Sequence, residues 1–320
     1  MKKPFYYGGQ AVIEGVMMMG PKEYAVSVRK ENGEIITKKE PVDTIKNKYP
    51  ILKWPIIRGF VNLIEMMALG MKNITWSANQ SGEEDEDLGF WGMFLAIAVA
   101  VVVVLAMFFA APVMLGTWLH PYIGDFGRSL VEGIIRISIF ILYIVLVRRM
   151  EDIRRVFQYH GAEHKSIAAW EHNDELTPEA AQKYTTLHMR CGTAFMLMVM
   201  IVMIVVFTFV GQTESSWARI LIKLISMPFI AGLTYEVTRF AAGHCQYKAV
   251  RIFMAPGLWM QKLTTEEPDL SQLEVALTSL KAVIPNYYQD HPEEMPPNNQ
   301  KNDTVDGEEI SEKTTEEEIN

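Results

Sequence analysis

The sequence predicts an α-helical polytopic membrane protein of about four transmembrane helices with a small cytoplasmic α+β portion. Hydrophobic residues make up 49% of the 320 residues, and they are concentrated in a few long runs. Another segment alternates polar and apolar residues on either side of an Asn-Gly pair. Long apolar runs are typical of membrane-spanning helices, and alternation around Asn-Gly is typical of a β-hairpin.

Four apolar segments are the predicted membrane spans. The first and third contain no Asp, Glu, Lys or Arg over about 20 residues, which is enough to cross the hydrocarbon core. The second contains Glu132 and Arg136, which must face each other or other protein groups, and the fourth contains Pro228 and charges at both ends. The four predicted spans are residues 91–109, 129–147, 191–213 and 218–240.

Lys and Arg are concentrated on one side of these spans. Loop 148–190 contains seven of them, whereas 112–128 contains one and 212–218 contains none. By the positive-inside rule, loop 148–190 and both termini are expected in the cytoplasm. The lipid bilayer is therefore the first expected partner.

The helix predicted over residues 53–80 has an unusual distribution of charge. Arg58, Glu65 and Lys72 recur every seven residues and form one narrow polar stripe on an otherwise apolar helix. This pattern favours a helix that lies in the membrane interface. If the helix crossed the membrane instead, there would be five spans.

The remaining segments complete the predicted organisation. Residues 24–37 form the expected hairpin with Asn32-Gly33 at its turn, and apolar residues at helical spacing predict an amphipathic helix over 268–284. The tail after Ile284 is Pro- and acid-rich and is expected to be disordered. The predicted regions are a cytoplasmic N-terminal region 1–52, the interfacial helix 53–80, an acidic linker 81–89, a transmembrane region 90–241, a cytoplasmic helical segment 242–284 and the tail 285–320.

The motif with the clearest chemistry is H-x-x-E-H in loop 148–190, formed by His160, Glu163 and His164. Two imidazoles at i and i+4 lie on one face of a helix, so both can reach one divalent metal ion. A glutamate beside them can act as the general base for a water bound to the metal. We therefore expect a divalent metal, most simply zinc, with Glu163 as the catalytic residue.

A catalytic zinc needs at least a third protein ligand. The predicted topology brings the ends of three spans to the same cytoplasmic level, which makes Glu236 the first choice and His188 the second. Other residues are expected near the site as a second shell or as substrate contacts. They are Gln10, Glu14, Arg190, Cys191 and His244.

Each of these residues also has a simpler structural interpretation. The two histidines of the motif can contact lipid phosphates or cap a packed interface. Glu236 can pair with Arg239 at i+3, and Cys191 can be a small buried residue. The glycine-rich segment around Gln10 and Glu14 can be a tight turn that allows close backbone packing.

Four segments in order resemble a known family. They are residues 8–18, 160–165, 190–195 and 256–265. The segments are similar to those of the YqhQ-like family of bacterial membrane proteins, and the resemblance extends over about residues 4–284. It implies a bacterial cytoplasmic membrane protein. About activity it implies little, because the family is usually described as a domain of unknown function or a predicted metal-dependent enzyme.

The expected function is a metal-dependent, hydrolytic enzyme at the cytoplasmic face of the membrane. In this hypothesis His160, His164 and Glu236 bind the ion, and Glu163 takes a proton from the bound water. One alternative is a non-enzymatic scaffold or assembly factor that binds other membrane proteins or forms homo-oligomers. A second alternative is a transporter that uses Glu132 and Arg136. No nucleic-acid-binding signature is present in the sequence.

Overall fold

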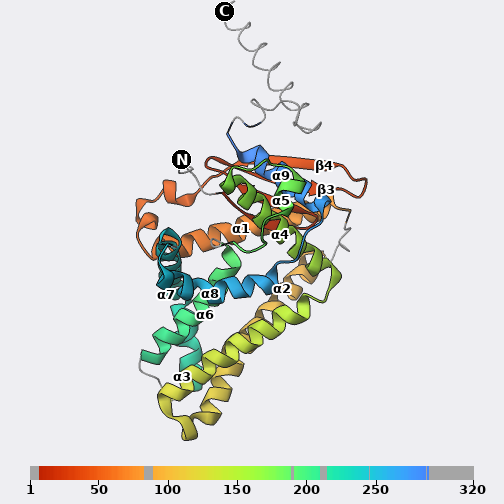
Figure 1. The fold of residues 1–320 in the computed structure, drawn as a ribbon. Coiled ribbons are helices and arrows are strands. Elements are labelled where there is room, and N and C mark those ends of the chain that lie inside the picture. Colours follow the sequence, from red (N-terminus) through yellow and green to blue (C-terminus); the bar gives the residue numbers. More distant parts are fainter. Residues whose placement is uncertain are drawn as a thin grey trace, which may run out of the picture.

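The computed structural model describes residues 7–82, 89–188, 191–209, 215–244, 246–285 and 287. A head of one β-sheet and several helices occupies one end of the molecule, and long apolar helices extend from it to the other end (Figure 1). The head is built from the N-terminal region, the segment 148–188 and the C-terminal helix. The linker expected over 81–89 lies mostly outside the described residues, and so does nearly all of the tail after Pro285.

The sheet has four antiparallel strands in the order β1-β2-β3-β4. Strands β3 and β4 form the predicted hairpin, and Gly33 at its turn has a φ of 85°, which glycine adopts without steric cost. Strands β1 and β2 form a second hairpin in the segment that was expected to be a tight turn. The strands are Gly8–Val12, Gly15–Met19, Glu23–Arg29 and Ile35–Pro41.

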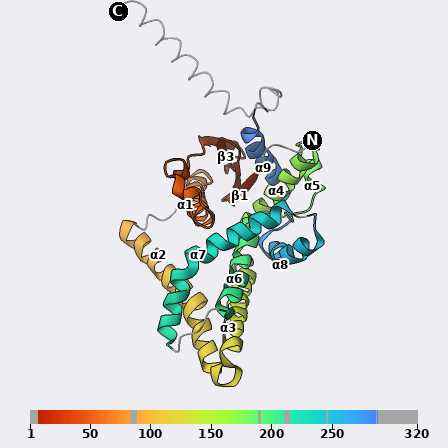
Figure 2. The same ribbon diagram turned by 90° about the vertical axis from the view of Figure 1, so that its left-hand side faces the viewer.

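Helices cover both faces of this sheet, as Figure 2 shows. Met17 and Met18 are adjacent on β2 and point to opposite faces, because side chains alternate along a strand. Met18 packs in a core with α4, α5 and α9, whereas Met17 packs in a core with α1. These helices are α1 (Ile57–Gln80), α4 (Glu151–His172), α5 (Pro178–Gln182) and α9 (Leu270–Val283).

Helix α9 confirms the predicted C-terminal amphipathic helix. It begins after Asp269, whose side chain accepts a hydrogen bond from the backbone of Gln272 in a capping box. Leu273, Leu277 and Leu280 recur on one side of the helix and are fully buried.

Helix α1 begins at Ile57 and is preceded by short 3₁₀ turns at Ile45–Asn47 and Pro50–Lys53. The predicted polar stripe of α1 pairs with charges of other segments, although the side chain of Lys72 is 55% exposed. Its three charges pair with groups of other segments, and the apolar side chains on the other side of the helix are exposed, as expected where a helix contacts lipid. The pairs are Arg58 with Glu236, Glu65 with Lys46 and Lys72 with Glu40, and the exposed side chains include Ile64, Met66, Met67 and Met71.

The other end of the molecule consists of apolar helices. Three helical segments are long and apolar enough to cross a membrane: Ile97–Val147, Gly192–Phe209 and Ser216–Ala241. The first has 51 residues, and its backbone leaves helical geometry at Gly124, where φ is 64°. Figure 2 shows the chain reversing direction within α3, in its yellow part. The helices are α2 (Gly89–Leu105), a π-helical turn (Ala106–Ala110), α3 (Ala111–Val147), α6 (Gly192–Phe209), α7 (Ser216–Gly243) and α8 (Lys248–Thr264).

Substitution of one leucine of α9 tests the packing of the head. Leu277 is 1% exposed and Leu270 on the same helix is 47% exposed. We expect Leu277→Ala to lower the free energy of unfolding by about 2–5 kcal/mol, because it leaves a cavity between the sheet and α4. Leu270→Ala is the matched control and should change it by less than about 1 kcal/mol. Thermal unfolding in detergent, followed by intrinsic fluorescence, measures both, and equal losses would contradict the described packing.

Candidate metal centre

Helix α4 places the H-x-x-E-H motif in the interior of the molecule. Its first turn contains Glu151 and Asp152, which favour the helix N-terminus, and Asn173 ends it in the left-handed conformation. The residues from Tyr159 to Ile167 are all buried, although a helix at a protein surface has one exposed side. The motif therefore lies where the sheet, α9 and the ends of the apolar helices enclose α4.

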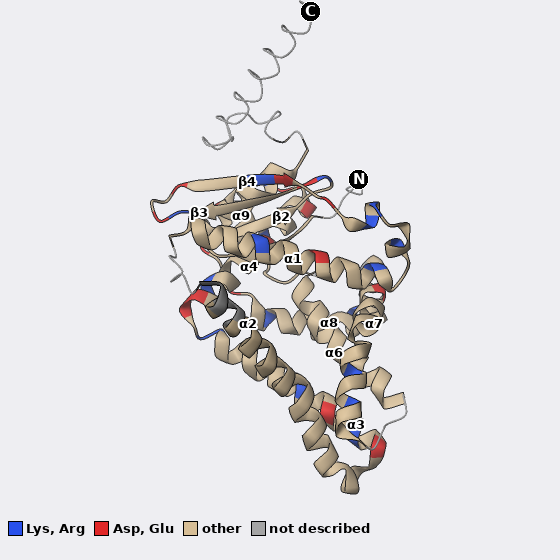
Figure 3. Ribbon diagram, turned by 180° about the vertical axis from the view of Figure 1, so that it is seen from behind, with Lys and Arg blue, Asp and Glu red and all other residues tan. Residues whose placement is uncertain are grey.

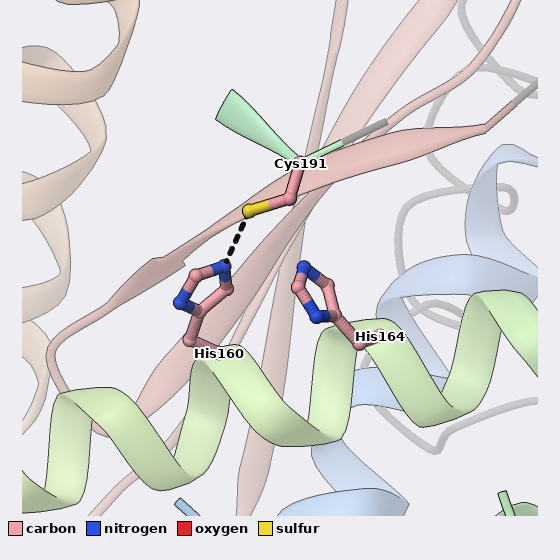
Figure 4. Close-up of side chains that lie close together, drawn as sticks. All are labelled: His160, His164 and Cys191. Atoms are coloured by element: carbon pink, nitrogen blue, oxygen red, sulfur yellow. Dashed lines mark hydrogen bonds between the residues drawn. The ribbon is translucent and has the colours of Figure 1, made fainter. Parts of the chain in front are cut away.

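Three potential metal ligands meet at this place. A nitrogen of His160, a nitrogen of His164 and the Sγ of Cys191 all lie within 4.8 Å of one another. Figure 4 shows both rings extending from α4 toward Cys191, which directly precedes α6. The Nε2 of His160 is 3.2 Å from Sγ, and the two ring centroids are 4.5 Å apart.

The Nδ1 atom of each ring contacts a backbone carbonyl. The Nδ1 of His160 is 2.7 Å from the carbonyl oxygen of Thr264, and the Nδ1 of His164 makes the same kind of contact with Thr186. A carbonyl can only accept, so each Nδ1 donates and each Nε2 is left as an acceptor, which in His160 faces the thiol of Cys191. The Nε2 of His164 is buried and has no hydrogen-bond partner in the described part of the chain. Metal-binding histidines are usually oriented in this way.

Close backbone contacts set the positions of these carbonyls. The link between α8 and α9 crosses α4 at Gly161, where a Cβ would lie 2.1 Å from the carbonyl oxygen of Glu266. Glycine at this position therefore lets the link, and with it the Thr264 carbonyl, approach His160. The side chain of Gln261 binds both the backbone N–H and the carbonyl of His188, at 2.8 and 2.7 Å, and so fixes the segment that contains Thr186.

Glu163 lies beside the histidines in a dry environment. Burial raises the pKa of its carboxyl to about 7, and the nearby His160 only partly opposes this shift. Strand β1 covers the carboxyl group, since a Cβ at Gly9 would lie 3.1 Å from the carboxyl carbon. Oε2 of Glu163 is buried without a hydrogen-bond partner in the described residues. A carboxyl group with a pKa near neutrality can both accept and donate a proton.

Burial also lowers the proton affinity of the imidazoles. It lowers the pKa of His164 well below its usual value, to which the neighbouring His160 contributes, and lowers the pKa of His188 to about 4. Both rings are therefore neutral at physiological pH, which metal binding requires. Burial raises the pKa of the Cys191 thiol, so the thiol would have to lose its proton on metal binding.

Neither of the two expected third ligands belongs to the three-residue group. His188 is near it, with its ring centroid 5.6 Å from that of His164, but its Nε2 is turned to Glu171 at 3.4 Å. Glu236 instead pairs with Arg58 of α1, whose Nε is 2.6 Å from Oε1, and a second hydrogen bond joins the same two side chains. Glu236 thus connects α7 to α1, and the expectation that it completes the metal site is not supported.

The other predicted residues have separate places. Gln10 packs against Gly70 of α1. Glu14 accepts two hydrogen bonds from Arg155 of α4, with Nε to Oε1 at 2.5 Å. His244 caps α7, where its Nδ1 is 2.8 Å from the carbonyl of Phe240. Arg190 lies outside the described residues.

Cys191 is the residue whose role sequence reasoning underestimated. It was expected only in a second shell, and the structure brings it into contact with His160. The sequence offered one indication of this contact. Cys191 directly precedes a predicted span, and the cytoplasmic ends of the spans lie at the same level as the H-x-x-E-H motif. The contact itself depends on how α6 packs beside α4, which no spacing in the sequence encodes.

Gly161→Ala tests the approach of the α8–α9 link. Alanine normally favours a helix over glycine by about 1 kcal/mol. Here we expect the substitution to lower the stability by about 1–3 kcal/mol, because the new Cβ collides with the carbonyl of Glu266. Gly243→Ala at the end of α7 is the control, since no other atom lies within 4 Å of its Cβ position. Thermal unfolding measures the stability of both variants. If Gly161→Ala were more stable than Gly243→Ala, the described contact would be wrong.

Glu163→Gln tests the burial of the carboxyl group. Because the folded-state pKa lies above the unfolded value, the metal-free protein should lose stability as pH rises from about 4.5 through 7, by at most ~3 kcal/mol. Glutamine cannot ionise, so the variant should gain stability relative to the wild type between pH 5 and pH 8. Thermal unfolding with a chelator measures this difference, with Glu179→Gln at an exposed position as the control. If the difference in stability between the variant and the wild type did not change with pH, the conclusion that Glu163 is buried and retains its proton would be wrong.

Comparisons with known proteins identify the family. The family described as "Protein of unknown function (DUF1385)" matches residues 54–286. "Uncharacterized protein YqhQ" of Bacillus subtilis (strain 168) is 33% identical over 298 residues, which cover 88% of this chain and 93% of the relative. No solved structure matches the chain. The resemblance to YqhQ-like proteins is thereby confirmed, and the chain belongs to the DUF1385 family.

Proposed function

We propose that the chain is a metal-dependent, hydrolytic enzyme whose centre is formed by His160, His164 and Cys191. The observation that carries the proposal is the orientation of the two rings. Each Nδ1 is held by a backbone carbonyl, and the remaining ring nitrogens and a thiol lie within 4.8 Å of one another. Packing alone does not account for the buried Nε2 of His164, which has no partner in the described chain, since an unpaired buried nitrogen is costly.

The ligand set favours zinc. Two imidazole nitrogens and one thiolate form a borderline-soft set that suits this ion, and three protein ligands leave a fourth position for water. The residues fit such an ion because the buried Nε2 of His164 has no other partner in the described chain. A bound zinc would supply a Lewis acid that lowers the pKa of water.

Glu163 is the proposed proton acceptor. It lies on the same helix as both histidines, and its pKa of about 7 suits a group that takes a proton from water and returns it to a leaving group. Strand β1 and α4 shield it from bulk solvent, which strengthens its electrostatic interactions. Hydrolysis is therefore the reaction class that these residues serve best.

We further propose four membrane passes with the head in the cytoplasm. A straight helix of 51 residues would be about 75 Å long at ~1.5 Å per residue, more than twice the hydrocarbon core of about 30 Å. The reversal at Gly124 divides this segment into two passes, and α6 and α7 add two more. The basic residues of segment 148–188 favour the cytoplasm for the head, and the resemblance to the bacterial relative favours the cytoplasmic membrane.

The two alternative functions predict that different substitutions would impair the protein. A scaffold or assembly factor for membrane proteins would use the exposed apolar side of α1 and would tolerate Glu163→Gln. A transporter would depend on Glu132 and Arg136 in α3. Neither has an observation as specific as the paired orientation of His160 and His164.

Metal content tests the proposal. We expect about one zinc ion per chain by elemental mass spectrometry of detergent-purified protein, and its loss in His160→Ala/His164→Ala and in Cys191→Ser. His172→Ala is the matched control, because His172 lies on the same helix with an exposed side chain. Glu163→Gln should keep the metal and lose hydrolytic activity.

Cobalt substitution separates the thiolate from the imidazoles. A cobalt-loaded protein should show a near-ultraviolet charge-transfer band from thiolate to cobalt, and Cys191→Ser should remove this band. The proposal fails if the wild type binds no zinc or cobalt even when the metal-free protein is loaded, or if the His172→Ala control loses metal as fully as the double variant does.

A further inference from the structure

A second group of buried charges lies far from the metal centre. Figure 3 shows Lys, Arg, Asp and Glu gathered beside α3 at the end of the apolar helices opposite the head. Charged side chains among membrane-spanning helices are costly and usually serve a function. We call this group the basic cluster. Its cations are Arg128, Arg136, Arg219 and Lys223.

The basic cluster has more positive than negative charge. Each of its four cations is at most 5% exposed, whereas Glu132 is the one fully buried carboxylate that the described apolar helices provide. Asp125 pairs with Arg128 at 2.9 Å, but its side chain is 68% exposed. Lys223 lies within electrostatic range of Arg128, Arg136 and Arg219. Buried charge of one sign requires a counter-charge.

The negative charge of Glu132 is already neutralised within the cluster. It forms ion pairs with both Arg219 and Lys223 of α7 and holds them against α3. Arg219 also donates from Nη1 to the hydroxyl of Thr117 at 3.1 Å. The carboxylate therefore neutralises one of these two cations and has no charge left for Arg136.

Arg136 is held in position by backbone and ring contacts. Its Nε donates to the carbonyl oxygen of Phe108 at 2.7 Å, and its guanidinium carbon lies 5.8 Å from the ring centroid of Phe109. Both phenylalanines belong to the π-helical turn, and such turns often occur at functional sites. Neither contact supplies a negative charge.

Several nitrogen atoms of the cluster have no partner. In the described part of the chain, Nη2 of Arg136 and Nε of both Arg128 and Arg219 are buried without a hydrogen-bond acceptor. Unpaired guanidinium groups that are held in place match the forked geometry with which arginine binds phosphate. An acceptor from outside the chain would satisfy these donors and the excess charge together.

We propose that the basic cluster binds a phosphate group, which enters from the membrane side opposite the head. Arg136 and Lys223 supply the charge at the inner end of the site, and Arg128 and Arg219 supply it near the turn at Gly124. The same chemistry is presented by the phosphate of an anionic lipid and by free inorganic phosphate. This inference does not depend on the metal centre, since no residue is shared.

Thermal unfolding of the full-length protein in a phosphate-free maltoside detergent tests the proposal. One arm titrates inorganic phosphate against chloride of equal ionic strength, and the other adds phosphatidylglycerol against a neutral diacylglycerol. A rise in melting temperature with phosphate identifies free phosphate as a ligand, and a rise with phosphatidylglycerol alone identifies the lipid headgroup. No rise in either arm, or an equal rise with chloride, would overturn the proposal.

Substitutions locate the binding. Arg136→Lys retains the positive charge but removes the forked donors, so the ligand concentration for half-maximal stabilisation should rise at least tenfold. Arg154→Gln, on the exposed side of α4, should leave it unchanged. If Arg136→Lys does not fold, Lys223→Gln provides the second test with the same expectation. Binding of equal strength in the wild type and in either folded cluster variant would place the phosphate elsewhere and refute the inference.

Discussion

The burial of helix α4 on all sides is the constraint on which the rest of the head depends. A helix with no exposed side in its middle turns must satisfy every polar side chain internally, since water is excluded. In α4 these include two histidines, a glutamate and a lysine in six consecutive residues. Lys165 meets this requirement with Glu267 and the carbonyl of Gln182. Both histidines meet it at Nδ1 and His160 also contacts the Cys191 thiol through Nε2, whereas the Nε2 of His164 has no partner among the described residues.

The segments that resemble the family in sequence surround this helix. Gly9 of the first segment brings β1 against Glu163, and Cys191 of the third contacts His160. Gln261 and Thr264 of the fourth hold His188 and His160. The segments are separated by long stretches of chain, so their meeting is a property of the fold. A purely structural role for the motif would need the packing contacts but not the alignment of free ligand atoms.

Some of this arrangement could be predicted from the sequence, and the reasons are local. The hairpin turn at Gly33, the capped helix after Asp269 and the charge-free span that became α6 each depend on neighbouring residues. The second hairpin was missed because its strands are short and glycine-rich, a composition that normally disfavours strands. Glu236 was expected at the metal site because it ends a predicted span at the level of the motif, and its actual partner, Arg58, is 178 residues away in the sequence.

The identity of the third ligand does not change the net charge of the proposed site. With Glu236 as ligand, two neutral imidazoles and one carboxylate would surround the ion, and a thiolate at Cys191 carries the same single charge. Either set would leave a zinc ion with one net positive charge in a buried space, where such a charge is costly. Glu163 can supply the balancing negative charge, because its carboxyl is buried beside the same histidines and loses its proton near neutral pH. If the site binds a metal, ionisation of Glu163 and occupation of the site would be coupled, and each would favour the other. A bound ion would therefore favour the ionised form of Glu163, the form that can take a proton from water, whereas the burial that encloses α4 favours its protonated form.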